Sequence, residues 1–309
     1  ASDVGVLDVL SYAWTFGDGS SAVGASVSNT YVNEGQYVVT LTVTDGDGGS
    51  DVQTLTVAVG NAAPVVTSLT APGGDEGAPV SFSATATDAG VNDTLTYTWD
   101  FGDNTVATGA SATHVYDDDG TYQASLTVMD NAGASAQVGV EVIILNVDPV
   151  ILTMLATPNA NPDEGDEVDF SATATDQGTA DILDLTYSWD FGDGSPVFPG
   201  YLSEHTWADD GVYTVTLTVL DGDGGSAVQT MTITVINVAP EIGTSPPINA
   251  LQDTLYSYQP SVVDPGDEVF TWSLSPSAPA AMTIDAQTGF ISWTPDYNDS
   301  LTGQYSIVM

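Results

Sequence analysis

Hydrophobic and polar residues alternate along much of this chain with a period of two. The clearest runs, at 39–43, 124–128 and 215–219, read Val-Thr-Leu-Thr-Val, Ala-Ser-Leu-Thr-Val and Val-Thr-Leu-Thr-Val. Strict alternation over such a length indicates a strand with one buried face. Gly, Asp, Asn and Pro separate the runs, which is typical of turns between short strands. The pattern predicts an all-β protein.

The same motifs return in the same order, so the chain is a tandem repeat. A Tyr-x-Trp-x-Phe-Gly-Asp motif begins at Tyr12, Tyr97 and Tyr187, and a Gly-x-Tyr motif begins at Gly35, Gly120 and Gly211. Asn-x-x-Pro linkers follow at 61–64, 146–149 and 237–240. With about seven short strands per unit, the repeat predicts tandem immunoglobulin-like β-sandwiches in a linear array. We expect domains at 1–60, 61–146, 147–238 and 239–309, called domains 1 to 4 below.

The repeated aromatic residues suit the core of such a sandwich. The tryptophan of each first motif lies where a third strand buries a tryptophan, and the Gly-x-Tyr tyrosine fits a tyrosine corner, whose hydroxyl bonds nearby backbone. We therefore expect these rings to be structural. His114 and His205 occupy one repeat position, which Asn29 fills in domain 1, and we expect them to pair strands or loops rather than to catalyse.

These motifs resemble a known family. The segment Trp-Asp-Phe-Gly-Asp-Gly at 189–194, the His205–Trp207 step and the Gly-x-Tyr-x-Val-x-Leu-Thr-Val-x-Asp segment at 211–221 are together similar to the polycystic kidney disease (PKD) domain. The resemblance covers residues 1 to about 238 and implies spacer domains of secreted and surface proteins in bacteria and archaea. Residues 240–309 instead resemble the dystroglycan-type cadherin-like, or immunoglobulin-like, module, which is also a β-sandwich spacer. That second resemblance rests on segments at 256–258, 263–267, 270–274, 282–285 and 288–295.

The charge of the chain removes several classes of function. Lys and Arg are absent and Asp plus Glu number 42, so the formal net charge is -42, and Cys is absent too. Nucleic acid and anionic membrane are poor partners because their phosphates need basic residues, so we expect no nucleic-acid binding and no insertion into a membrane. Catalysis by Lys, Arg or Cys and disulfide bonding are excluded as well. No apolar run approaches the ~20 residues of a membrane helix, whereas 42% hydrophobic residues are enough for a folded core.

Strand order places the acidic loops at the two ends of each sandwich. The loop between the second and third strands, the loop between the sixth and seventh strands and the linker Asn share the end that faces the preceding domain. An Asp-Glu turn, a Gly-Asp turn and the acidic turns at 117–119 and 209–210 share the opposite end. Stacked ends would gather carboxylates with no protein cation to offset them, and hard oxygen ligands in such number suit Ca²⁺.

The candidate Ca²⁺ ligands are Asn61, Asp88, Asp93 and Asp130 around domain 2, Asn146, Asp176, Asp181 and Asp221 around domain 3, and Glu76 and Glu164 in the opposite turns. The alternative is that Asp and Gly residues form good turns and a soluble surface adapted to high salt, with no ordered ion.

Both ends of the chain fall inside a domain by this alignment. Residues 1–3 align with 174–176, so domain 1 would lack its first two strands, and residues 304–309 read as a penultimate strand. Two explanations stay open. The chain is part of a longer repeat polypeptide, or identical subunits supply the missing strands in a donor-strand fibre.

Two hypotheses of function follow, and neither is an enzyme. The first is an extracellular or cell-surface structural segment, such as the shaft of a fibre or adhesin, with joints stiffened by Ca²⁺ and partners that are neighbouring domains or identical subunits. The second is an accessory module of a secreted enzyme or adhesin that binds a polysaccharide or a cell-surface protein. Phe198 and Tyr201 are aromatic residues that would stack on sugars in the second case.

Overall fold

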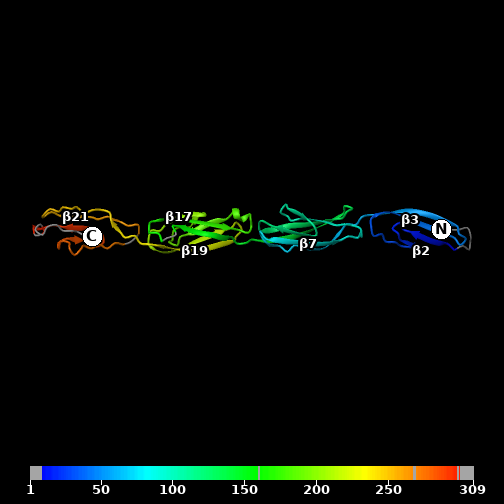
Figure 1. Cartoon of the computed structure of the whole chain (residues 1–309), viewed down its shortest axis with the longest axis horizontal. Helices are drawn as coiled ribbons and strands as arrows, with labels where there is room; N and C mark the ends of the chain where they lie inside the picture. The colour runs from blue at the N-terminus through cyan, green and yellow to red at the C-terminus, as the bar shows by residue number, and fades with distance from the viewer. Residues whose placement is uncertain (1–8, 159–160, 267–268, 298, 300–309) are drawn as a thin grey trace. The chain divides into compact units, whose positions relative to one another are not determined.

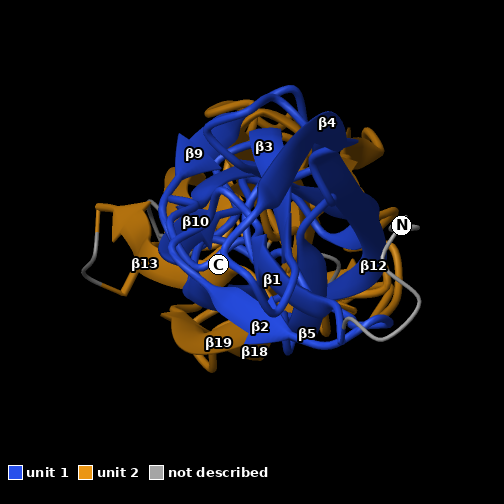
Figure 2. Cartoon of the chain, turned by 90° about the vertical axis from the view of Figure 1, so that its right-hand side faces the viewer, with its two compact units in different colours: residues 1–147, 177–181 blue, residues 148–176, 182–309 orange. Residues whose placement is uncertain are grey.

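The computed structural model describes residues 9–158, 161–266, 269–297 and 299. The expectations for residues 1–3 and 304–309 lie outside the described residues. The chain forms two compact units, residues 1–147 with 177–181 and residues 148–176 with 182–309, which Figure 2 colours separately. Each is described by itself here. Within the described ranges no helix is long and apolar enough to span a membrane.

Domain 1, in the first unit, forms one antiparallel sheet with the strand order β2-β1-β3-β4. Its strands are β1 (Ser11–Thr15), β2 (Ser21–Val23), β3 (Gly35–Thr44) and β4 (Ser50–Val59). The longest pairing joins β3 to β4 from Gly35↔Val59 to Thr44↔Ser50. The alternating run at 39–43 therefore lies in a strand, as predicted.

Domain 2 is a two-sheet sandwich. One sheet has the order β10-β7-β5 and the other β6-β12-β11-β8-β9. The strands are β5 (Val65–Thr70), β6 (Gly74–Asp75), β7 (Pro79–Thr87), β8 (Thr96–Asp100), β9 (Val106–Thr108), β10 (Ser111–Val115), β11 (Gly120–Met129) and β12 (Ser135–Leu145). All pairs are antiparallel except β6 with β12, which is parallel. That short parallel pair holds the turn that carries Glu76.

Domain 3, in the second unit, repeats this sandwich with sheets β13-β14-β17 and β16-β15-β18-β19. Its elements are β13 (Val150–Thr157), β14 (Glu167–Thr175), a 3-10 helix η1 (Asp181–Leu183), β15 (Thr186–Asp190), β16 (Phe198–Pro199), β17 (Leu202–Thr206), β18 (Gly211–Leu220) and β19 (Ser226–Val235). Figure 1 labels β7 of domain 2 and β17 and β19 of domain 3. The equivalent of β6 is a single parallel bridge between Asp163 and Ile236.

Domain 4 has two small antiparallel sheets, β20-β22 and β21-β24-β23. The strands are β20 (Glu241–Ile242), β21 (Tyr256–Tyr258), β22 (Val262–Val263), β23 (Thr283–Ile284) and β24 (Ile291–Trp293). Tyr256, Tyr258, Met282 and Ile291 form its buried cluster. The whole architecture is thus all-β with immunoglobulin-like sandwiches in tandem, as the sequence predicts.

The repeated aromatic residues fill the cores of domains 2 and 3. Trp99 and Trp189 are fully buried between the two sheets. Each indole Nε1 donates to a backbone carbonyl, that of Gly109 at 3.0 Å and that of Gly200 at 2.9 Å, so burial leaves no donor unpaired. The prediction of a structural tryptophan is confirmed.

The tyrosine corner is also confirmed in all three repeats. The Tyr37 hydroxyl donates to the Asn33 carbonyl at 2.9 Å, and Tyr122 and Tyr213 do the same to Asp118 and Asp209 at 3.0 and 2.9 Å. These bonds fix the turn that precedes β3, β11 and β18. In domains 2 and 3 that turn is the acidic turn at one end of the sandwich.

Candidate cation sites at the ends of the domains

The turn that carries Glu76 is held by backbone on both sides. The Glu76 amide donates to the Leu145 carbonyl at 3.0 Å, and Oε1 of its side chain accepts the Val147 amide at 2.7 Å. The residue is 0% exposed. Its second oxygen, Oε2, is buried and accepts no hydrogen bond from the described residues. A buried carboxylate oxygen without a donor is costly unless a positive charge lies beside it.

Domain 3 builds the same arrangement from different residues. The Glu164 amide donates to the Ile236 carbonyl at 2.9 Å, and Oε1 accepts the Val238 amide at 2.8 Å. Glu164 is 2% exposed, and within the described part of the chain its buried Oε2 also lacks a donor. Each of the two sandwiches therefore buries one glutamate carboxylate, in the same geometry, and leaves one oxygen of that carboxylate without a hydrogen-bond donor.

A short segment from the third repeat belongs to the first unit and contacts the Glu76 turn. Residues 177–181 cluster with that unit. Gln177 Nε2 donates to the Glu76 carbonyl at 2.9 Å, and the Ala180 amide donates to the Asp117 carbonyl at 3.3 Å. These two bonds place Asp181 next to Glu76.

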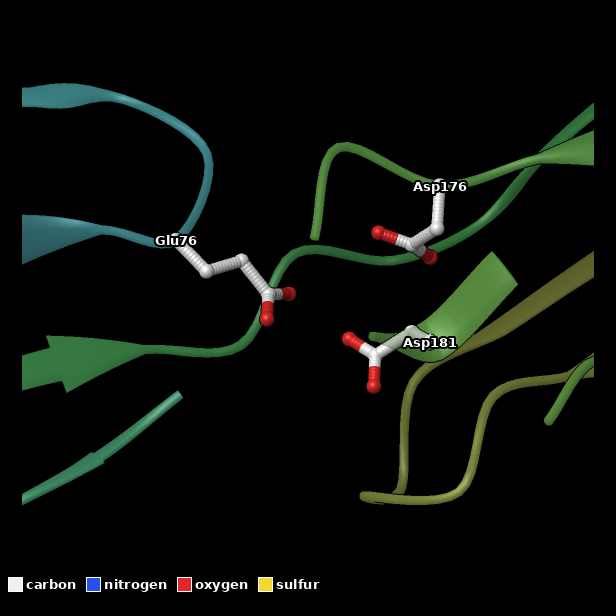
Figure 3. A group of neighbouring side chains, drawn as sticks. All are labelled: Glu76, Asp176 and Asp181. Carbon is white, nitrogen blue, oxygen red and sulfur yellow. The ribbon is translucent and has the colours of Figure 1, made fainter. Parts of the chain in front are cut away.

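The Glu76 and Asp181 carboxylates point toward each other (Figure 3), and each offers an oxygen within 4.8 Å of the other. Asp181 is 2% exposed and begins η1. Asp176, also labelled in Figure 3, is a buried residue at the start of the same loop. Two buried carboxylates this close suit a divalent cation, whose charge offsets their repulsion.

Gly178 leaves space between these two carboxylates. A Cβ at Gly178 would lie 2.5 Å from Glu76 Oε2 and 2.7 Å from Asp181 Oδ2. Both contacts are shorter than real Cβ contacts, so a side chain here would displace the carboxylates. The glycine thus keeps open the volume into which both oxygens face.

Domain 2 has the equivalent loop, in which Asp88, Gly90 and Asp93 match Asp176, Gly178 and Asp181. The Gly90 amide donates to Asp88 Oδ1 at 3.0 Å, which makes an Asx turn. Among the described residues, the buried Oδ2 atoms of Asp88 and Asp93 have no hydrogen-bond partner. Desolvation raises the pKa of Asp93, and repulsion from Glu34, Asp88 and Asp130 adds to that rise.

The loop between the last two strands uses its aspartate differently. Oδ1 of Asp130 accepts the Ala132 and Ala134 amides at 2.9 and 3.0 Å, and Oδ2 accepts Asn61 Nδ2 at 2.8 Å. The Asn61 hydrogen bond is the main cause of the lowered pKa of Asp130. Asp221 Oδ1 likewise accepts three backbone amides of its own loop at 2.8–3.0 Å. Protein donors therefore already bind these two carboxylates, which close their loops.

Each of the two histidines pairs with an aspartate of the Gly-Asp turn. His114 Nε2 lies 2.5 Å from Asp103 Oδ2, and His205 Nε2 lies 2.7 Å from Asp193 Oδ2. The His114 ring stacks on Phe101 and the His205 ring on Phe191, with ring centroids 4.2 and 4.1 Å apart. In domain 1, Asn29 Nδ2 donates to Asp18 Oδ2 at 2.8 Å in the same place. A neutral amide that replaces the imidazole indicates a structural pairing.

Three stretches of the chain, residues 1–59, 61–144 and 146–235, match the family model of the PKD domain. The chain belongs to the PKD domain family. The expected resemblance is therefore confirmed for the first three domains. These family ranges end at residue 235, and the resemblance of domain 4 to a cadherin-like module stays a prediction.

The relatives of these PKD domains are long proteins. The chain is 32% identical over 139 residues to the pre-pro-metalloprotease PrtV of Vibrio cholerae, a match that covers 44% of this chain and 14% of that protein. It is 31% identical over 195 residues to human polycystin-1, which covers 60% of this chain and 4% of that protein. Collagenase ColA of Bacillus cereus is 38% identical over 58 residues, 19% of this chain and 6% of that protein. The chain thus spans a small part of each.

Single PKD domains of known structure align with one domain at a time. The PKD1 domain of Vibrio anguillarum Epp is 29% identical, with 28% of this chain and 96% of that one aligned and a TM-score of 0.23. The PKD1 domain of Vibrio cholerae PrtV is also 29% identical, with 27% and 98% aligned and a TM-score of 0.23.

The structure brings together some of the sequence-predicted ligands of the PKD domains. Asn61 lies beside Asp130, and Glu76 lies beside Asp181. Asn146 precedes Val147, whose amide binds Glu76. Glu76 lies in a cluster with Asp118 and Asp119, and Glu164 lies in a cluster with Asp209 and Asp210. The sequence places these four aspartates at the same end of the sandwich as the glutamates but does not mark them as ligands.

One further aspartate was missed. Asp264 in domain 4 forms the same Asx turn as Asp88, with Oδ1 accepting the Gly266 amide at 3.0 Å, and in the described chain its buried Oδ2 has no partner. The Asp-x-Gly spacing at 264–266 is the signal that would have identified it, because it repeats the spacing at 88–90 and 176–178.

Proposed function

We propose that this chain is a non-catalytic accessory segment of a larger secreted or cell-surface protein, and that its PKD domains hold Ca²⁺ at their ends. Membership of the PKD family supports the extracellular setting, since metalloprotease and collagenase relatives carry the same domain beside other regions. The buried Glu76 with its unused Oε2, next to Asp181, carries the cation part of the proposal. Extracellular Ca²⁺ modules bind at about 10⁻⁴ to 10⁻³ M, which suits a protein outside the cell.

The mechanism follows from charge. The chain has no Lys or Arg, so nothing in its side chains offsets the carboxylates except two histidines. Bound Ca²⁺ would cancel repulsion between acidic loops and fix their geometry, and its removal would loosen the linkers. The segment then serves as a spacer whose stiffness depends on Ca²⁺. Domain 4, in this proposal, continues the spacer as a cadherin-like module.

Small-angle scattering of the full chain tests the spacer. Chelation of Ca²⁺ should change the maximum dimension and broaden the distance distribution, and the D88N/D93N variant should respond less than the parent. A maximum dimension that is the same with Ca²⁺ and with chelator would count against cation-stiffened linkers.

A second candidate, recognition of a polysaccharide or protein, has one observation in its favour. Domain 3 exposes Tyr201 by 60% and Phe198 by 37%, at the point where the chain passes from β16 in one sheet to β17 in the other. At the equivalent positions domain 2 has Ala110 and Ala107, so only domain 3 offers aromatic rings there. Planar rings at a surface are suited to stacking on sugars or to protein contacts.

A binding array with insoluble polysaccharides and extracellular matrix proteins tests this candidate. The parent chain should bind a ligand that Y201A does not bind, while V106A, at an exposed residue in domain 2, should bind like the parent. Tyr201 suits the test better than Phe198, because its side chain is more exposed and its ring lies 6.4 Å from that of Tyr187, whereas the Phe198 ring lies 5.6 Å from that of Phe191. Failure of the parent chain to bind any surface would leave the spacer as the only function proposed.

A further inference from the structure

We propose that PKD domains 2 and 3 each bind a second divalent cation, at a site formed by Glu76, Asp118 and Asp119 in domain 2. The same site in domain 3 consists of Glu164, Asp209 and Asp210. These aspartates lie in the turn before β11 and β18, not in the loops of Asp88, Asp93 and Asp130. The inference rests on the proposed function, because it shares Glu76 and the unused Oε2 of Glu76 with it. Its other ligands come from a different turn, although Asp118 also offers an oxygen within 4.8 Å of Asp181.

The three carboxylates of each set are close together. Glu76, Asp118 and Asp119 each offer an oxygen, all within 4.8 Å of one another, and Glu164, Asp209 and Asp210 do the same. Oxygens at this spacing can surround one ion with bonds of about 2.3–2.6 Å, the range for Ca²⁺. Without a cation, three like charges at such distances repel.

Backbone hydrogen bonds hold the two turns of each site together. The Gly77 amide donates to the Tyr116 carbonyl at 2.8 Å, directly before the acidic turn, and the Gly165 amide donates to the Trp207 carbonyl at 2.9 Å. The tyrosine-corner hydroxyls bond the Asp118 and Asp209 carbonyls from the other side. The site is therefore built before any ion arrives, which lowers the entropy cost of binding.

An independent observation distinguishes these sets from ordinary surface acids. Glu76 and Glu164 are 0% and 2% exposed, and each presents a buried Oε2 that accepts no hydrogen bond within the described ranges. The other oxygen of each is fixed by a linker amide at 2.7 or 2.8 Å, so Oε2 cannot rotate toward solvent without breaking that bond. A cation is the partner that such an oxygen lacks.

The repetition of the site argues against chance. The turns read Asp117-Asp118-Asp119 and Ala208-Asp209-Asp210. They differ at the first position and agree at the two positions whose side chains cluster with the buried glutamate. Two separately folded cores thus place two aspartates and one buried glutamate alike.

Another acidic cluster provides the contrast. Glu167, Asp169 and Glu204 also offer oxygens within 4.8 Å, across β14 and β17 of domain 3. All three are exposed, and none presents a buried oxygen without a donor. We do not extend the proposal to this cluster, and it serves as the control.

Bound calcium in the full chain tests the inference. After equilibrium dialysis at about 1 mM free Ca²⁺, the upper end for extracellular modules, the metal content is measured for the parent, D118N/D119N, D209N/D210N, the combination of these two, D88N/D93N and the control D169N/E204Q. Each double variant removes two negative charges, so non-specific attraction falls equally. We expect D118N/D119N and D209N/D210N each to lose one ion per chain, the two together to lose two, and D169N/E204Q to lose none.

The outcomes separate this inference from the proposed function. An unchanged ion count in the combined D118N/D119N/D209N/D210N variant overturns the second site, while a loss in D88N/D93N would still support a Ca²⁺ site in the loop of Asp88 and Asp93. A loss of ions in the combined variant with no loss in D88N/D93N supports the second site and removes the site in that loop. An equal loss in all double variants, the control included, would show diffuse attraction and overturn the inference. Circular dichroism of each variant confirms that the sandwiches are folded.

Discussion

Oε1 of Glu76 accepts the backbone amide of Val147 at 2.7 Å, which ties the turn after β6 to the linker that leaves domain 2. The same bond joins Glu164 to Val238 at 2.8 Å. In both domains a glutamate therefore does two things with two oxygens. One satisfies a linker amide, and the other remains for a partner that the described protein atoms do not supply.

These two roles can be separated by substitution at Glu76. In E76Q the amide oxygen can still accept the Val147 hydrogen bond, but the buried charge is gone. We expect E76Q to raise the melting temperature of domain 2 in chelator and to reduce the further rise produced by Ca²⁺. In E76A the Val147 amide loses its acceptor, which should cost about 1–3 kcal/mol in chelator.

Differential scanning calorimetry of the full chain, with and without Ca²⁺, measures both variants. E141Q is the control, because Glu141 is an exposed residue of β12 whose charge lies outside the site. A parent chain and an E76Q variant with equal responses to Ca²⁺ would show that the buried oxygen has no part in cation binding.

Gly178 tests the volume between the carboxylates. A Cβ there would lie 2.5 Å from Glu76 Oε2 and 2.7 Å from Asp181 Oδ2, while the backbone at this position is not in the left-handed region. G178A should therefore weaken Ca²⁺ binding by displacing the ligands, without the backbone strain that many glycine substitutions cause. We expect at least a tenfold lower affinity in a Ca²⁺ titration followed by tryptophan fluorescence.

The matched control for G178A is G46A. A Cβ at Gly46 meets no atom within 4 Å, and its φ is likewise outside the left-handed region. G46A should bind Ca²⁺ like the parent chain. Equal affinity for G178A and the parent would contradict the placement of a cation between Glu76 and Asp181.

Asp18 provides a test of pH dependence in domain 1. Hydrogen bonds from the Ser20 hydroxyl, Asn29 and the Ser20 amide lower the pKa of Asp18 to about 2. A carboxylate with a lowered folded-state pKa stabilises the fold above its unfolded value of 3.8, and the contribution disappears as the pH falls through the folded value. We expect the difference in stability between the parent and D18N to be constant above about pH 5 and to shrink as the pH falls toward 2.

Urea denaturation at several pH values measures this difference, because the other carboxylates titrate in both proteins and cancel. N29D is a useful second variant, since it places a like charge beside Asp18 and should destabilise domain 1 near neutral pH. A parent and D18N with the same pH profile would show that the Asp18 loop bonds do not form in solution.

The sequence predicts the fold well for a physical reason. The period-two runs at 124–128 and 215–219 lie in β11 and β18, with alternating burial, because one face of the sheet that also carries Trp99 or Trp189 packs into the core. The tryptophan and tyrosine motifs specify core and corner locally. Such features depend only on the order of residues within a short segment, so they can be predicted without knowing which strands lie next to it.

The cation sites are less predictable because they depend on side-chain direction. Sequence reasoning treats Asp130 and Asp88 alike, yet Asp130 turns both oxygens to protein donors whereas Asp88 leaves Oδ2 unused. It also leaves Asp118 and Asp119 out, because nothing in a strand pattern shows that Glu76 turns inward toward them. The direction of Glu76 follows from its bond to Val147, a contact across 71 residues.

The two sandwich cores should unfold as separate units, and Trp189 tests this. Trp189 is fully buried, contacts Phe170 and donates to the Gly200 carbonyl at 2.9 Å. W189A should destabilise domain 3 by about 3–5 kcal/mol, the usual cost of removing a large aromatic side chain from a core. Because Trp99 lies in a different core cluster, the transition of domain 2 should keep its midpoint.

Calorimetry of the full chain in chelator measures the transitions of domains 2 and 3, and W99A should produce the opposite result, with only the domain 2 transition lowered. The paired variants control for each other, because they remove the same side chain from equivalent positions of two repeats. If W189A lowers both transitions equally, the two domains share a cooperative unit. Their cation sites could then not be treated as independent, and the one-ion loss expected for each pair of aspartate substitutions would have to be reconsidered.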